Sequence, residues 1–300
     1  MKQKKNGNVC VVGSINMDLT VATNKIPAQG ETVLGGEFVT NYGGKGANQA
    51  VAASRMGTHV HMIGAVGADA FGADILTHLQ AEGVETNNIE TIHNQATGIA
   101  NITLSEGDNR IIVASGANLS VTPALINRHE QIIKQSNTVL LQLEIPLETV
   151  IHTIELANKY DVPVVLNPAP YQSLPEKVIA GATYITPNAL ELEAMQQNIE
   201  YEAIKHKIIV TRGSKGVEYY EGAQLQDIPS YPLEVQDTTG AGDTFNGVLA
   251  AMLTKQEQIA SAIHIANAAA GLSITKMGAQ SGMPTYNEVQ RFIQEREIYL

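Results

Sequence analysis

Cysteine is almost absent from this 300-residue chain. Cys10 is the single one, so no intramolecular disulfide can form and a reducing compartment is expected. Because it lies within an apolar run, we expect an inert thiol buried in a strand. No apolar segment approaches the roughly 18 residues of a membrane span, and the run after Lys2, Lys4 and Lys5 is too short for a secretory signal. These observations predict a cytoplasmic protein with no membrane partner.

Basic residues are also scarce. The chain has 19 Lys and Arg against 30 Asp and Glu, a net charge of −11, which argues against a nucleic-acid partner. The 44% hydrophobic content is typical of a globular protein, and the length allows two average domains or one large α/β domain. An acidic protein that binds phosphate must do so locally, through backbone amides and a metal ion.

Short β-branched runs alternate with longer helical patterns. The predicted strands are 9–12, 60–63, 138–143, 162–166, 183–185 and 207–211, and the predicted helices are 47–56, 72–81, 122–134, 146–160 and 188–197. This alternation indicates a parallel sheet covered on both faces, with ligands at the carboxyl ends of its strands. Residues 15–42 and 96–115 instead have period-two apolar spacing. We interpret them as a small antiparallel lid inserted into a single α/β domain spanning residues 1–300.

The segment 237–243, Asp-Thr-Thr-Gly-Ala-Gly-Asp, is the most informative part of the chain. It precedes a helical pattern that ends near Lys255, so a strand end, a glycine turn and a helix start follow one another. The first N–H groups of a helix lack intrahelical partners and attract phosphate, and glycines allow close approach. Asp243 either caps this helix or accepts a proton from a group that attacks the phosphate.

Three further polar residues follow predicted strands. Asn16 and Asp18 follow the first strand, and Glu144 follows the strand predicted at 138–143. They are either turn formers or partners for the hydroxyl groups of a sugar. Acidic residues that converge at strand ends favour a neutral sugar over an acid.

The glycine-rich turn at residues 43–48 opens a helix. It is not a Walker A loop, because Gly46 follows Lys45 where Ser or Thr would ligate magnesium. The turn is either a flexible loop or a place where backbone approaches a small polar ligand, with Lys45 and Asn48 as donors.

Two later turns also have either a structural or a ligand-binding interpretation. Asn188 and Glu191 are three residues apart at a helix start, so they form either a capping box or part of a magnesium site that acts through waters. The turn at 211–217 either only joins two strands or lies beside a nucleotide.

In this order and spacing, the segments resemble the ribokinase branch of the PfkB carbohydrate kinase family, from about residue 8 to residue 290. The motifs that carry the resemblance are 13–18, Pro27-x-x-Gly-Glu-Thr followed by 43–50, Asn-Pro-Ala-Pro at 167–170 with the Asn188 and Glu191 pair, and 237–243. The resemblance implies a three-layer α/β/α sandwich with a mostly parallel central sheet and a small β-sheet lid. It also implies transfer of phosphate from ATP to O5 of D-ribose.

The resemblance also implies roles for matching positions. Asp243 would be the general base, and the amides of Gly240, Ala241 and Gly242 would form an anion hole. Sugar would be held by Asn16, Asp18, Gly44, Lys45, Asn48, Glu144 and Asp243. The ATP-binding site would be lined by Asn188, Thr211, Gly213, Gly216, Gly242 and Asn267. Asn188 and Glu191 would organise Mg²⁺ and its waters. Potassium would be bound by Asp237, Thr239, Ser273, Lys276, Gly278 and Gly282. The lid strands would pair two subunits into a homodimer.

Two departures from the family pattern stand out. Gly282 occupies a place where the family often has Ser, and the stretch 195–206 is shorter than usual. Two other functions remain open: a kinase for another sugar or a nucleoside, such as 2-deoxyribose, fructose or adenosine, or a sugar sensor that has lost catalysis. The hydroxyl partners disfavour a deoxy sugar, which would leave a buried acceptor unpaired.

Overall fold

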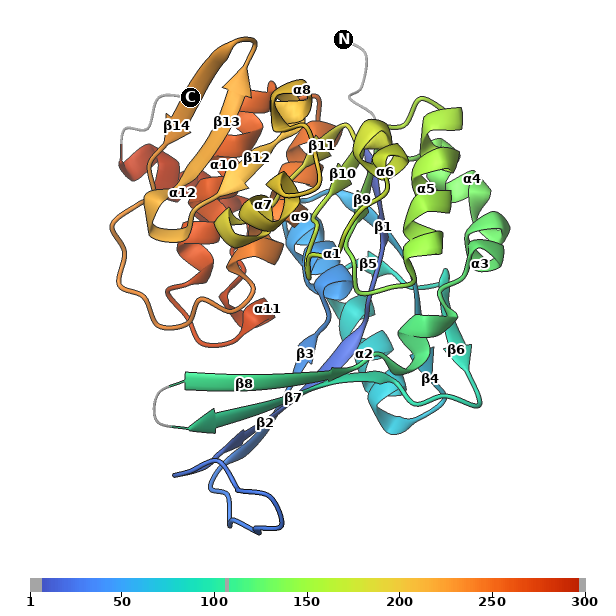
Figure 1. The fold of residues 1–300 in the computed structure, drawn as a ribbon, viewed down its shortest axis with the longest axis vertical. Helices are drawn as coiled ribbons and strands as arrows, with labels where there is room; N and C mark the ends of the chain where they lie inside the picture. Colours follow the sequence, from blue (N-terminus) through green and yellow to red (C-terminus); the bar gives the residue numbers. More distant parts are fainter. Residues whose placement is uncertain (1–6, 106–107, 297–300) are drawn as a thin grey trace.

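The computed structural model describes residues 7–105 and 108–296 (Figure 1). Its central sheet contains β1 (Asn8–Val12), β4 (His59–Gly67), β5 (Val84–Glu85), β6 (Ile89–Ile92), β9 (Thr138–Leu141), β10 (Val164–Leu166) and β11 (Tyr184–Ile185). The order is β11-β10-β9-β1-β4-β5, with β6 also paired to β4, and every pair is parallel. This confirms the parallel sheet predicted from the alternation of strands and helices.

Alternate side chains of each strand point to opposite faces of this sheet. On β1, Val9 and Val11 belong to one buried cluster, whereas Cys10 and Val12 belong to the other. Both faces are therefore apolar, as a sheet with helices on each side requires. The Cys10 thiol is fully buried, and burial raises its pKa to about 12, which agrees with an inert strand thiol.

Two helical layers cover the sheet (Figure 1). The first layer comprises α1 (Lys45–Arg55), α2 (Ala70–Ala81), α9 (Ala241–Thr254), α10 (Ile259–Ser273), α11 (Ala279–Gly282) and α12 (Tyr286–Glu295). The second comprises α3 (Pro123–Arg128), α4 (Glu130–Gln135), α5 (Leu147–Lys159), α6 (Glu176–Gly181), α7 (Ala189–Gln196) and α8 (Tyr201–Ile204). No helix in residues 7–105 and 108–296 is long and apolar enough to cross a membrane.

A second, four-stranded sheet projects from the body of the molecule (Figure 1). We call it the lid sheet: β2 (Asn16–Ala22), β3 (Phe38–Gly43), β7 (Gly98–Ser105) and β8 (Asp108–Ala114), in the order β3-β2-β7-β8. The outer pairs are antiparallel, but β2 and β7 are parallel. The small antiparallel lid sheet is therefore confirmed in its two hairpins, and the hairpins meet through one parallel pair at the centre, because each hairpin fixes only its own pairing.

Other predictions need correction. The helix predicted at 122–134 is broken at His129 into α3 and α4, and the strand predicted at 138–143 ends at Leu141. The strand predicted at 207–211 begins two residues later, as β12 (Ile209–Thr211). It pairs antiparallel with β13 (Val217–Glu221) across the turn predicted at 211–217, and β14 (Gln224–Ile228) follows. In the described part of the chain, two isolated parallel bridges, Ile185 with Ile208 and Asn188 with Thr211, join this small sheet to β11 and the residues after it. The short connection between β12 and β13 favours local pairing over extension of the parallel sheet.

Candidate functional site

Asp243 lies in the first turn of α9 and is buried, with 8% of its surface exposed. Its carboxylate oxygens accept hydrogen bonds from Asn48 Nδ2 and Gln49 Nε2 of α1, both at 2.9 Å. The N-cap of α9 is Gly240, which offers no side chain, and within the described chain no hydrogen bond joins the Asp243 carboxylate to its own helix. The geometry therefore departs from the capping interpretation: α1 orients the carboxylate.

The backbone before Asp243 presents free N–H groups. Gly240 has φ 78°, a left-handed conformation that suits glycine. Ala241 N–H makes a turn contact with Thr238 O at 3.3 Å. Among the residues that the structure describes, the N–H groups of Gly242 and Asp243 have no hydrogen-bond acceptor. A helix N-terminus with such unpaired donors stabilises an anion.

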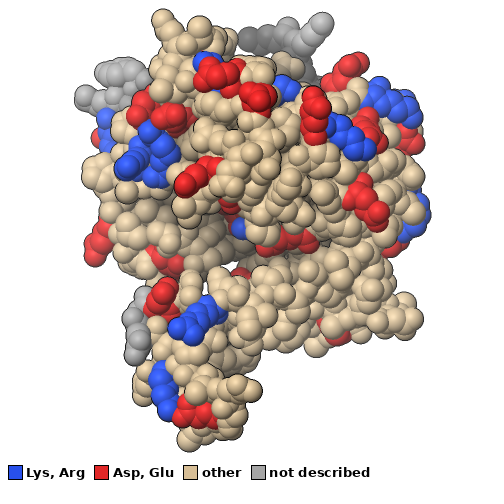
Figure 2. Space-filling model, viewed as in Figure 1, with Lys and Arg blue, Asp and Glu red and all other residues tan. Residues whose placement is uncertain are grey.

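A cavity of about 130 Å³ opens at this helix start. Its lining joins residues from α1, α7 and α9 and from the carboxyl ends of β10, β11 and β12: Lys45, Asn167, Ala169, Thr186, Asn188, Glu191, Thr211, Gly240, Gly242, Asp243 and Asn246. Seven of these were predicted from the sequence. Figure 2 shows the surface hollowed between the body and the lid sheet, with charged side chains visible there.

The residues predicted to hold a sugar lie beside Asp243. Glu144 Oε2 accepts hydrogen bonds from Ser14 Oγ at 2.6 Å and from the Lys45 backbone N–H at 3.2 Å. Asn16 is buried, and its Oδ1 accepts a hydrogen bond from Asn118 Nδ2 at 2.8 Å. The Glu144 carboxylate thus bridges the segment after β1 and the start of α1.

Gly44 makes this junction possible. It is the N-cap of α1 with φ 86°, and a Cβ there would lie 2.7 Å from the backbone nitrogen of Asn16. A side chain would collide with backbone and would also be strained by the positive φ. Glycine at position 44 is therefore required for close packing of the start of α1 against the backbone of residues 14–16.

The site concentrates negative charge around one cation. Burial opposes the charge on Lys45, but the carboxylates of Asp243, Glu144, Glu191 and Asp18 raise the pKa of this lysine. Burial, reinforced by Glu144 and Asp243 and opposed by Lys45, raises the pKa of Asp18 to about 7. Such a set of carboxylates can accept hydrogen bonds from several alcohol groups and can take a proton from one of them.

Asn188 and Glu191 form the capping box that the sequence left open. Asn188 Oδ1 accepts a hydrogen bond from Glu191 N at 2.9 Å, and Glu191 Oε2 accepts one from Asn188 N at 2.8 Å. Both residues also line the cavity, and burial raises the pKa of Glu191. Capping and a contact with a ligand in the cavity are therefore compatible.

The remaining residues predicted to bind nucleotide are more dispersed. Thr211 lines the cavity, and its N–H donates to Pro187 O at 3.0 Å. Gly213 and Gly216, with φ 55° and 87°, form the turn between β12 and β13. Asn267 on α10 donates to Pro229 O at 3.0 Å and does not line the cavity.

The two segments predicted to bind potassium are adjacent. The Asp237 carboxylate accepts hydrogen bonds from the N–H groups of Thr239 at 2.9 Å and Gly278 at 2.8 Å. Although burial alone would raise it, these bonds hold the pKa of Asp237 below its usual range. A Cβ at Gly282 would lie 2.2 Å from Ser273 O, so this glycine packs directly on the carbonyl of another predicted ligand.

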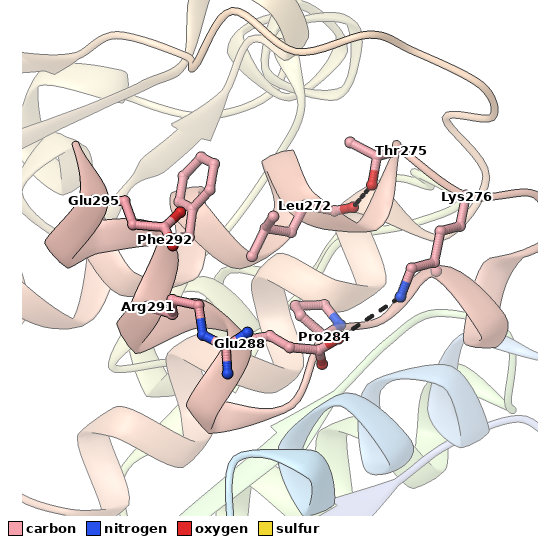
Figure 3. A pocket seen from close by; sticks show the side chains of 9 residues that line it. Leu272, Thr275, Lys276, Pro284, Glu288, Arg291, Phe292 and Glu295 are labelled. Carbon is pink, nitrogen blue, oxygen red and sulfur yellow. Dashed lines mark hydrogen bonds and ion pairs between the residues drawn. The ribbon is translucent and has the colours of Figure 1, made fainter.

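Lys276, unlike the other residues predicted to bind potassium, directs its side chain to a different cavity. Its side chain extends toward Glu288, with Nζ 3.8 Å from Oε1, at a separate cavity of about 220 Å³ (Figure 3). Leu272, Pro284 and Phe292 form the apolar part of that cavity. Only the backbone carbonyl of Lys276 could therefore serve a cation beside Asp237.

Of the amides around Asp243, sequence reasoning predicted Asn48 and missed the others. Gln49 also donates to Asn167 Oδ1 at 3.0 Å and accepts from Gln142 Nε2 at 2.6 Å, while Gln280 Nε2 donates to Asn48 Oδ1 at 2.8 Å. Gln49 and Asn167 belong to motifs noted in the sequence, which was a usable signal. For Gln142 and Gln280 the sequence contained no signal, because their contacts are made only in the tertiary structure.

Comparisons with known proteins identify the family of the chain. The model of the pfkB family of carbohydrate kinases matches residues 6–286. A ribokinase from Bacillus subtilis is 47% identical over 95% of this chain and 99% of its own length. A deoxyribokinase from Salmonella typhi is 32% identical over 97% of this chain and 100% of its own. The structure of Arabidopsis thaliana ribokinase with ribose and ATP superposes with a TM-score of 0.89 and 29% identity, covering 97% of this chain and 99% of that one. The chain therefore belongs to the pfkB family of carbohydrate kinases and is a sugar kinase.

Proposed function

We propose that this enzyme phosphorylates D-ribose at O5, using ATP and releasing D-ribose 5-phosphate and ADP. One observation carries the proposal: a buried carboxylate, Asp243, is held by two side-chain amides at a helix start where the N–H groups of Gly242 and Asp243 are unpaired. A base and an anion site then lie within one turn of backbone. The 47% identity to a ribokinase and the likeness to a ribokinase that binds ribose and ATP support ribose and ATP as the substrates.

In the proposed reaction, Asp243 takes the proton of the 5-hydroxyl group as the oxygen forms its bond to the γ-phosphorus. The bond between that phosphorus and the leaving oxygen of ADP breaks. Because the transition state is loose, the proton leaves late, and a carboxylate can serve as the base. The N–H groups of Gly240, Ala241 and Gly242 stabilise the equatorial charge, a contribution worth on the order of 10²–10³ in rate per donor in other enzymes.

The sugar would be oriented by the carboxylates of Asp18 and Glu144 and by the amides of Asn16 and Asn48. A sugar with a hydroxyl group at every position satisfies these groups, whereas 2-deoxyribose leaves one of them unpaired. A deoxyribokinase is 32% identical, against 47% for a ribokinase, so 2-deoxyribose is the second candidate substrate. A non-catalytic sugar sensor would have no use for the Asp243 arrangement.

Two metal ions fit the residues present. Glu191 lines the cavity next to Asn188 and can hold Mg²⁺ through waters, while the Asp237 carboxylate and backbone carbonyls of the segment 273–282, which contacts Asp237 through Gly278, could hold a monovalent cation such as K⁺. Mg²⁺ would neutralise phosphate charge on bound ATP. Thr239, Ser273 and Gly278 are the other candidates for the K⁺ shell.

We also infer a homodimer formed through the lid sheet, in a cytoplasmic protein folded as one domain with the lid inserted. Phe38, Ile111, Ile112 and Val113 expose 60%, 52%, 74% and 48% of their surface on β3 and β8. Apolar strands exposed to this extent are typical of surfaces that another chain covers.

A coupled assay of ADP release tests the proposal. Ribose, 2-deoxyribose, fructose and adenosine are compared with Mg²⁺ and ATP, with and without K⁺. We expect the highest kcat/KM for ribose and a higher rate with K⁺. A clear preference for another substrate would overturn the ribose assignment, equal rates without K⁺ would remove the K⁺ site, and sugar binding with no ADP release would favour a sensor.

A further inference from the structure

Two glutamines lie one step behind the amides that contact Asp243. Gln280 Nε2 donates to Asn48 Oδ1 at 2.8 Å, and Asn48 Nδ2 donates to Asp243 Oδ2 at 2.9 Å. Gln142 Nε2 donates to Gln49 Oε1 at 2.6 Å, and Gln49 Nε2 donates to Asp243 Oδ1 at 2.9 Å. Each oxygen of the carboxylate therefore accepts a hydrogen bond from an amide that itself accepts one from a glutamine. We call each such pair of amides a relay; in both relays the donors point toward Asp243.

The polarity of a relay depends on its outer member. A carboxamide has a donor end and an acceptor end, and rotation by half a turn exchanges them. While Gln280 donates to Asn48 Oδ1, the Nδ2 group of Asn48 must face Asp243. Without that donor, Asn48 can turn its oxygen toward the carboxylate, which replaces an attractive charge-assisted contact by a repulsive one.

Gln280 is itself fixed firmly. It is buried, with 6% of its surface exposed, although it lies in the short helix α11. Arg55 Nη1 donates to Gln280 O at 2.7 Å and to Met283 O at 2.6 Å. The Nε and Nη2 groups of Arg55 each donate to Glu82 at 2.8 Å. The bidentate ion pair fixes the backbone of Gln280 relative to α1 and α2.

The other end of the Gln280 amide reaches the lid sheet. Gln280 Oε1 lies 2.7 Å from His78 Nε2, and the His78 ring is stacked on Tyr42 with centroids 3.8 Å apart and an interplanar angle of 10°. Tyr42 belongs to β3, and its hydroxyl donates to Asp74 at 3.2 Å. One continuous path of contacts thus runs from a lid strand through His78, Gln280 and Asn48 to Asp243.

We propose that Gln280 is a positioning residue: it orients the amide of Asn48 so that the Asp243 carboxylate faces the reacting alcohol. Through His78 it also couples this orientation to the position of lid strand β3. The proposal rests on the proposed function, because it assigns Asp243 as the base. Gln280 belongs to the segment next to the predicted K⁺ ligand Gly278, yet it acts through its side chain on the opposite side, toward α1.

Steady-state kinetics with ribose and ATP test the relay. We expect Gln280→Ala to lower kcat about 10- to 100-fold, a loss of about 1.4–2.8 kcal/mol of transition-state stabilisation at 1.4 kcal/mol per decade, with both KM values within threefold of wild type. Gln80→Ala is the control for the loss of a glutamine side chain outside the relay, because Gln80 is an exposed residue of α2 whose Nε2 donates to Thr86 Oγ1. The control should keep wild-type kcat.

The pH dependence of kcat in Gln280→Glu separates the relay from a loss of packing, because a packing defect would not depend on the protonation of residue 280. Its carboxylate can still accept from His78, but it cannot donate to Asn48 until it is protonated. The ratio of variant to wild-type kcat should therefore rise as the pH falls from about 7 to about 5, toward the ordinary glutamate pKa of about 4.3. A pH-independent ratio, wild-type kcat in Gln280→Ala, or an equal loss in Gln80→Ala would overturn the relay. A wild-type enzyme that phosphorylates no sugar would instead overturn the proposed function, so the two failures are distinguishable.

Discussion

The partly buried carboxyl group of Asp18, which lies near Lys45, should make the free energy of unfolding depend on pH. Burial, together with the carboxylates of Glu144 and Asp243, raises the pKa of Asp18 from 3.8 to about 7, against the opposing effect of Lys45. Between these two values the folded protein binds more protons than the unfolded chain. Stability therefore falls as the pH rises through this window. At 1.36 kcal/mol per pKa unit, the full cost above pH 7 is about 4 kcal/mol.

Replacing Asp18 by Asn removes this titration. The carboxamide in the Asp18→Asn variant is neutral at every pH, so the variant should gain stability relative to wild type as the pH rises. From pH 5 to pH 8 the difference in free energy of unfolding should grow by about 2–3 kcal/mol. Urea denaturation at both pH values measures it, with Asp108→Asn, an exposed carboxyl on β8, as the control for loss of one charge. A difference that stays constant with pH, or that changes equally in the control, would refute the reasoning.

Two further predictions concern the site and the lid sheet. Asp243→Asn should keep the affinity for sugar and ATP but lower kcat at least about 100-fold, because a general base contributes on the order of 10²–10⁴; near wild-type turnover, measured by ADP release, would remove Asp243 as the base. Ile112→Asp should convert the dimer to monomers in analytical ultracentrifugation, since it places a charge on the 74% exposed apolar residue of β8. Leu225→Asp, on exposed β14, is the matched control and should leave the mass unchanged; an unchanged mass for Ile112→Asp would exclude this face as the interface.

Local patterns predicted much of the architecture. Strand β1 reads as a continuous apolar run because both of its faces are buried, and the helix after residue 240 is evident from its apolar spacing. The helix 122–134 was wrong as a single element because apolar spacing does not reveal the break at His129. The strand at 207–211 and the hairpin turn after it were both predicted, because a short glycine-containing turn between two strand patterns is a local signal.

The site was predicted unevenly for a related reason. The glycines of 240–242 and the carboxylate of Asp243 are neighbours in sequence, so their joint presence was evident before any fold was known. The alternatives for Asn188 were not separable, because a capping box and a ligand site use the same two residues at the same spacing. The structure contains the capping box and places it at the cavity.

By itself the sequence determined the parallel α/β order, the glycine turn at the start of α9 and the carboxylate beside it, because each depends on residues that are close along the chain. Only the tertiary structure decided which way Asp243 faces, since Asn48 and Gln49 of α1 reach it from 195 and 194 residues away. Gln280, in another helix, contacts Asn48 across 232 residues. Hydrogen bonds between distant side chains depend on how the helices pack, and no local pattern encodes that packing.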